Sequence, residues 1–101
     1  MITRIWHGWR TYENATEYEQ LLREEIMPEI EAKGGEGCRS IQLLRRPDKK
    51  EVEFMTIILF DSLETVKRFA GEDFEQAYVP AAARKILKRY DERAQHYELC
   101  Q

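Results

Sequence analysis

The segment 51–60, EVEFMTIILF, constrains the fold of this chain more than any other stretch. Its β-branched and aromatic residues favour a strand, and its uncharged run 54–60 is too short to cross a bilayer. Successive side chains of a strand point to opposite faces, so one face carries Phe54, Thr56, Ile58 and Phe60 and the other carries Met55, Ile57 and Leu59. Both faces are apolar, which is typical of a strand covered on both sides.

Five further segments predict regular structure around this strand. Strands are expected over 1–9, 38–46 and 93–99, and helices over 15–34 and 61–91, the second of them broken before Pro80. Asn14 and Glu17 have the spacing of a capping box, and the Gly34–Gly35 pair favours the end of the first helix. Pro28 should kink or divide that helix, because it lacks a backbone N–H. The motif PDKK, 47–50, predicts a hairpin turn.

The order strand, helix, strand, strand, helix, strand is the split βαβ pattern of ferredoxin-like folds. It predicts an α+β domain, residues 1–101, with a four-stranded antiparallel sheet and helices on one face only. The first and third strands should lie at the centre, with the fourth beside the first and the second beside the third. The helix-free face would leave Met55, Ile57 and Leu59 in water at roughly 25 cal/mol per Å² of apolar area. We therefore expect a homodimer in which two sheets pack face to face as an α+β barrel.

Composition excludes several classes of partner. A net charge of −3 disfavours nucleic acid, because phosphate binding requires a concentrated basic surface. No segment is suited to a membrane, and no apolar leader marks the chain for export. Cys38 and Cys100 fit no C-x-x-C spacing, so reduced thiols and a cytoplasmic location are expected.

The whole chain resembles the antibiotic biosynthesis monooxygenase family of dimeric α+β barrels. The resemblance is carried by ITRIWHGW, YEQLLREEIMPEIEAKGG, SIQLLRR with EVEFMTIILFDSLETVKRFAGEDFE, and the terminal YDERAQHYEL. It implies oxygenation of electron-rich phenols or anthrones without metal or flavin, quinol oxidation, or haem degradation. The haem-degrading members use an Asn, Trp and His set. Here Trp6, His7 and Trp9 stand in place of an aligned Asn, and 62–78 contains no histidine, which disfavours the haem hypothesis.

Oxygenation without a cofactor requires a base, an apolar pocket and donors that hold the substrate anion. His7 and His96 are the candidate catalytic bases, since imidazole titrates near neutrality. Alternation places His7 with Ile5 and Trp9 on one face of the first strand, and Arg4 with Trp6 on the other. The histidines meet only if their strands present them to the same face, which the sequence leaves open. Each histidine has a structural alternative, as a hydrogen-bonded residue of the core or of the barrel seam.

Four further residues are candidates for binding an aromatic substrate: Arg4, Trp6, Trp9 and Tyr78. The alternative interpretation of the two tryptophans and Tyr78 is that they only pack in the core. The alternative for Arg4 is that it is a solvated residue on an end strand. Two histidines and two cysteines, none at ligand spacing, predict no metal site. The absence of G-x-G-x-x-G, P-loop and G-x-S-x-G motifs disfavours nucleotide cofactors and serine hydrolysis, so no cofactor is expected.

Three functional hypotheses remain. The first is an oxidoreductase that acts on an aromatic or quinol-like substrate in a cleft between sheet and helices, with His7 or His96 as base. The second is a module that binds a hydrophobic metabolite without transforming it. The third, disfavoured above, is a haem-binding protein.

Overall fold

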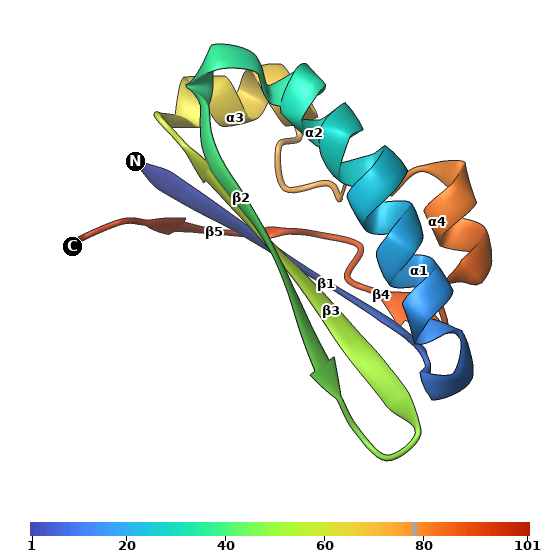
Figure 1. Ribbon diagram of the computed structural model, residues 1–101. Helices are drawn as coiled ribbons and strands as arrows, with labels where there is room; N and C mark the ends of the chain where they lie inside the picture. The colour runs from blue at the N-terminus through green and yellow to red at the C-terminus, as the bar shows by residue number, and fades with distance from the viewer. Residues whose placement is uncertain (78) are drawn as a thin grey trace.

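The computed structural model describes residues 1–77 and 79–101. Within them, five antiparallel strands form one sheet, and the helices cover one of its faces (Figure 1). The strands are β1 (Ile2–Thr11), β2 (Cys38–Pro47), β3 (Glu51–Phe60), β4 (Arg89–Tyr90) and β5 (Gln95–Glu98). The helices are α1 (Ala15–Leu21), α2 (Met27–Gly34), α3 (Leu63–Ala70) and α4 (Ala81–Ile86). The α+β class predicted from the sequence is therefore confirmed.

The strand order confirms the predicted topology. The path through the sheet is β2-β3-β1-β4, and β5 also pairs with β1. β1 and β3 are paired along their full length, from Ile2 opposite Phe60 to Thr11 opposite Glu51. The last strand differs from the prediction, because it reaches β1 as two separate pieces, β4 beside Gly8 and β5 beside Arg4.

The first helix follows its sequence signals closely. α1 and α2 are joined by a π-helical turn over Leu22–Ile26, directly before Pro28 at the start of α2. The proline ring would clash with the carbonyl four residues earlier in a regular α-helix, and the wider π turn avoids that clash. Gly35 ends the helix with a φ of 63°, as the glycine pair predicted. The predicted capping box is wrong: the Asn14 side chain does not cap α1, and its amide donates instead to Thr11 Oγ1.

The predicted helix over 72–91 is the main error of the sequence analysis. Of the described residues in this range, only Ala81–Ile86 are helical, and residues 72–77 run instead beside the segment that precedes β5. Ala77 N–H donates to the Glu92 carbonyl at 3.0 Å, and Ala94 N–H donates to the Glu75 carbonyl at 2.6 Å. These long-range hydrogen bonds replace the local bonds that a helix would make, so tertiary pairing overrides helical propensity here.

The two faces of the sheet differ as the alternation predicts. On the helix-covered face, the even-numbered residues of β3 from Val52 to Phe60 are buried, and they form the core with α1–α3. On the opposite face, the odd-numbered residues of β1 from Thr3 to Trp9 and those of β3 are half-buried, Ile5 and Ile57 among them. In the part of the chain that the structure describes, no helix is long and apolar enough to cross a membrane.

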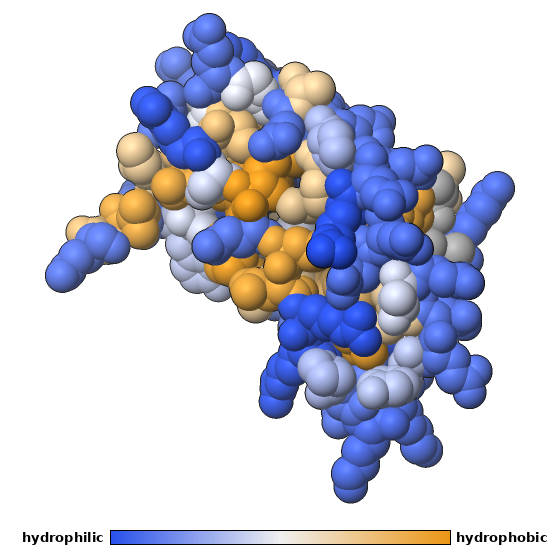
Figure 2. All heavy atoms as spheres, viewed as in Figure 1, coloured by the Kyte–Doolittle hydropathy of each residue, from blue (hydrophilic) through white to orange (hydrophobic). Residues whose placement is uncertain are grey.

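A second apolar region is visible at the β2 side of the molecule. Figure 2 shows hydrophobic side chains gathered at the centre of the view, between β2 and the helix formed by α1 and α2. Ile41 and Leu43 of β2 and Met27 of α2 are half-buried and pack against the core. The helices therefore cover the centre of the sheet more completely than its β2 edge.

Candidate functional site

A small cavity lies between the sheet and the helices. Its volume is about 30 Å³, which is enough for about one water molecule. Most of the lining is apolar and buried, and the polar side chains come from three elements. The lining residues are Arg4, Trp6, Tyr18, Leu22, Ile26, Ile30, Thr56, Ile58, Phe69, Pro80 and Ala83. This composition, mostly apolar with few polar groups, is that of small-molecule sites, whose volume is usually about 300–1,000 Å³.

Arg4 places a positive charge in this cavity. It comes from the helix-covered face of β1 and is only 4% exposed. Its guanidinium donates to the carbonyl of Phe74 and, at 2.9 Å, to that of Gln76. No described residue forms an ion pair with it, and burial lowers its pKa to about 10, so it stays charged at neutral pH. A buried cation without a carboxylate partner attracts an anionic ligand.

His96 stands directly beside this cation. β5 places it opposite Arg4, and its Nε2 lies 3.1 Å from the arginine Nη1. Because a guanidinium only donates, Nε2 must accept, and the ring proton is on Nδ1. Nδ1 is buried and has no hydrogen-bond partner among the described residues. Burial, and secondly the charge of Arg4, lower the pKa of His96, whereas Glu75 acts in the opposite direction.

Tyr18 supplies a second polar group to the cavity. Its side chain is completely buried in α1 and packs edge-on against Phe54, with ring centroids 4.9 Å apart. Its hydroxyl has no hydrogen-bond partner among the described residues. Burial raises its pKa far above the ordinary value and outweighs the opposing charge of Arg10, so the hydroxyl keeps its proton.

Trp6 forms one wall of the cavity and is fixed by the chain near its C-terminus. Its indole Nε1 donates to the carbonyl of Asp91 at 2.7 Å. Gly8, two residues along the same face of β1, lets the ring lie flat against the strand, since a Cβ there would come within 2.6 Å of the indole. The predicted role of Trp6 in an aromatic pocket is thus consistent with its position.

His7 and Trp9 lie on the opposite face of the sheet. His7 Nδ1 is 2.9 Å from the Asp91 carboxylate, and its Nε2 is 3.5 Å from Glu53. Its ring stacks on that of Trp9 with centroids 5.9 Å apart, and the guanidinium of Arg89 lies 3.9 Å from the centre of a Trp9 ring. The structure thus separates the two histidines: His96 contacts Arg4, which lines the cavity, whereas His7 lies on the other face, and neither histidine is itself among the lining residues. The expected substrate residue Tyr78 lies outside the described residues.

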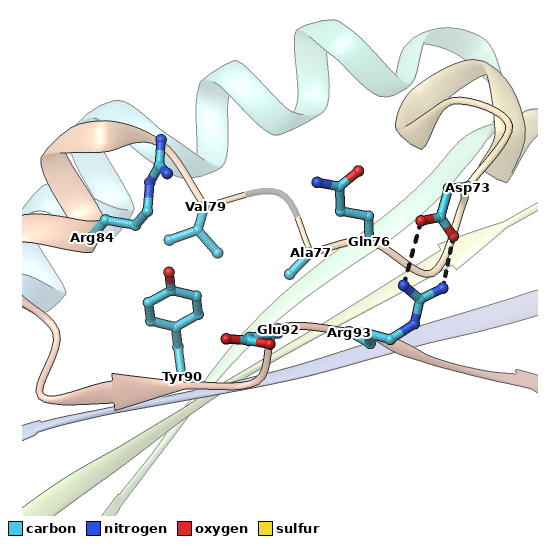
Figure 3. Close-up of a pocket in the computed structure, with 8 residues that line it drawn as sticks. All are labelled: Asp73, Gln76, Ala77, Val79, Arg84, Tyr90, Glu92 and Arg93. Atoms are coloured by element: carbon cyan, nitrogen blue, oxygen red, sulfur yellow. Dashed lines mark hydrogen bonds and ion pairs between the residues drawn. The ribbon is translucent and has the colours of Figure 1, made fainter.

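A larger and more polar depression of about 590 Å³ opens to the surface nearby. Figure 3 shows the Tyr90 hydroxyl directed toward Val79, and the bidentate pair of Arg93 with Asp73 at the other end. Gln76 lines this depression, while its carbonyl on the inner side holds Arg4. Gln76, Val79 and Pro80 therefore lie between the open depression and the closed cavity.

The sequence analysis missed Tyr18 and Thr56 as cavity residues. Tyr18 belongs to the apolar stripe of its helix, and Thr56 to the apolar face of β3, so both resembled ordinary core residues. Only the tertiary structure, which brings both side chains to the cavity that Arg4 also lines, distinguishes them. Among the described residues, no group of three or more His, Cys, Asp or Glu side chains is placed to hold a metal ion.

Comparison with known proteins supports the fold. No protein-family model matches the sequence, and a search of curated proteins gives no match. Among solved structures, the chain resembles a "putative antibiotic biosynthesis monooxygenase" from Bacillus cereus, with a TM-score of 0.51 and 17% sequence identity. The match covers 99% of this chain and 91% of that one. At this identity the likeness establishes a shared fold, which is the fold implied by the family resemblance.

Proposed function

We propose that this protein is a monooxygenase of the antibiotic biosynthesis type, which oxidises a small aromatic or quinol-like substrate in the cavity under the helices. The observation that carries the proposal is the buried charge of Arg4, which has no ion-pair partner among the described residues and faces an apolar cavity. A site of this kind favours the anionic form of a phenol or enol over its neutral form. The shared fold with the Bacillus cereus protein is consistent with this proposal.

Two residues would divide the chemistry between them. His96 is held neutral, and its Nε2 becomes available as a proton acceptor when Arg4 turns from it to the substrate oxygen. Arg4 then stabilises the substrate anion that results. The deprotonated, electron-rich substrate supplies the electrons that reduce molecular oxygen, so the protein's task is to bind, orient and deprotonate it. Trp6 and Phe69 offer aromatic surfaces against which a flat substrate can pack.

Substrate entry requires the cavity to enlarge. An apolar cavity that holds benzene measures about 150 Å³, well above the present 30 Å³. The part of the wall that moves is Pro80 with Ala83 of α4, the two small side chains by which this region lines the cavity. The open depression lined by Gln76 and Val79 is the route of approach.

We further propose that a second copy of the chain covers the helix-free face of the sheet. That face carries the half-buried Ile5, Met55, Ile57 and Leu59, together with His7 and Trp9. His7 would then belong to the interface and not to the cavity.

Oxygen uptake by the purified protein with an anthrone or a quinol tests the function. We expect His96→Ala to reduce turnover by at least tenfold, because general base catalysis is typically worth a factor of about 10² to 10⁴. His7→Ala is the matched control, since it removes the same side chain from the opposite face and should leave turnover nearly unchanged. Turnover that stays unchanged in His96→Ala would exclude the proposed catalytic role of His96.

A binding module without chemistry is the second candidate, and the same partly polar cavity favours it. In that case an aromatic ligand raises the unfolding temperature by mass action while no oxygen is consumed and no product forms. Haem titration checks the disfavoured third hypothesis, because haem binding would produce a Soret band that weakens when His96 or His7 is replaced.

A further inference from the structure

Tyr18 stands out because its hydroxyl is buried at a cost that nothing in the described structure offsets. The residue is 0% exposed and lines the cavity, and its hydroxyl has no hydrogen-bond partner from the described residues, with Arg10 acting on it only through its charge. A phenylalanine would pack equally well and avoid the desolvation of the oxygen. An unsatisfied polar group at a cavity wall is typical of a group reserved for a ligand.

The position of Tyr18 along the sheet separates it from Arg4. Tyr18 packs on Phe54, which pairs with Gly8, whereas Arg4 pairs with Ile58. Phe54 and Ile58 are four residues apart on β3, which is about 13 Å of strand. Trp6 and its partner Thr56 lie between them and line the same cavity. Tyr18 and Arg4 thus lie toward opposite ends of the cavity, and the aromatic ring of Trp6 lies between them.

We propose that the Tyr18 hydroxyl is a substrate-recognition group, which hydrogen-bonds a second oxygen of an elongated aromatic ligand whose anionic oxygen is held by Arg4. This rests on the proposed function in using the same cavity and the same anion-binding role of Arg4. The ligand class that fits is a flat aromatic of one or two rings with an oxygen at each end. Because burial keeps the Tyr18 hydroxyl protonated, it donates a hydrogen bond and does not act as a base.

The first test is the stability of the free protein. Tyr18→Phe should raise the unfolding temperature by about 4–8 °C, because it removes a buried polar group that lacks a partner. Tyr12→Phe is the matched control, since Tyr12 is 56% exposed and its hydroxyl faces solvent. A hydroxyl satisfied in the free protein, for instance by a single water in the 30 Å³ cavity, would make Tyr18→Phe neutral or destabilising and would overturn the proposal.

The second test is ligand affinity without turnover. Anaerobic titration with 2,6-dihydroxynaphthalene and with 2-naphthol compares two ligands that differ only in the far hydroxyl. We expect the wild-type protein to prefer the dihydroxy compound about five- to tenfold, and Tyr18→Phe to abolish this preference while 2-naphthol affinity is unchanged. Equal affinities in the wild type, no binding of either probe, or a preference that survives in Tyr18→Phe would each refute the assignment. Because no oxygen is present, the result is independent of whether the protein is an oxygenase, which oxygen uptake decides.

Discussion

Replacing Gly8 with alanine should displace Trp6 from its position in the cavity wall. A Cβ at residue 8 would lie 2.6 Å from Cη2 of Trp6, 3.0 Å from its Cζ3 and 3.2 Å from Leu87 Cδ2. Carbon atoms in contact stay about 3.5 Å apart, so the indole must retreat from 2.6 Å by about 0.9 Å. Leu87 closes the space on the other side of the new methyl group, so the ring and not the strand has to give way.

The expected loss in the free energy of unfolding has two contributions. Overpacking of a filled site costs about 1–3 kcal/mol. The displaced ring also gives up its 2.7 Å hydrogen bond to the Asp91 carbonyl, which adds about 1 kcal/mol. We therefore expect Gly8→Ala to lower the free energy of unfolding by about 2–4 kcal/mol.

A double-mutant cycle provides the assay. Urea unfolding is followed by tryptophan fluorescence for the wild type, Gly8→Ala, Trp6→Phe and the double variant, with Trp9 as the remaining reporter in the last two. Trp6→Phe deletes the clashing ring atoms, so Gly8→Ala should cost less than about 1 kcal/mol in that background. A loss below about 0.5 kcal/mol in the wild-type background, or equal losses in both backgrounds, would refute the steric argument.

Three other predictions concern different parts of the molecule. The pKa of His96 is lower in the folded protein than its ordinary 6.5, so the unfolded chain binds a proton first and stability should fall as the pH drops below about 6.5. His96→Asn should remove that part of the pH dependence, measured as the urea midpoint between pH 8 and pH 5, and an identical slope in the variant contradicts the assignment. Gly37→Ala places a Cβ 2.1 Å from Cγ2 of the buried Thr65 and should cost about 1–3 kcal/mol or more, a loss that Thr65→Ala should largely rescue in urea unfolding. Sedimentation at micromolar concentration should report twice the mass of one chain, and a well-folded single chain would exclude the proposed dimer.

The candidate site illustrates how far local sequence signals extend. The alternation of β1 correctly placed Arg4 and Trp6 on one face and His7 and Trp9 on the other, because side-chain direction in a strand depends only on sequence position. The position of His96 was not predictable, since the face on which it lies depends on the pairing of Arg4 with His96, residues at opposite ends of the chain. The helix predicted over residues 72–77 was wrong for the same reason. The backbone of this segment is hydrogen-bonded by Glu92, by Ala94 and by the guanidinium of Arg4, none of which is near in sequence.

The sequence by itself determined the order of elements as far as α3, the central place of β3, the hairpin, and the disturbance of the first helix at Pro28. Each of these follows from periodicity, turn chemistry or proline geometry within about ten residues. Only the tertiary structure decided that Arg4 is buried beside a neutral His96 and that the Tyr18 hydroxyl faces the same cavity without a described partner. The physical reason is that burial and desolvation are properties of the packed molecule, so a charge or a hydroxyl acquires its chemical role only when distant segments close around it.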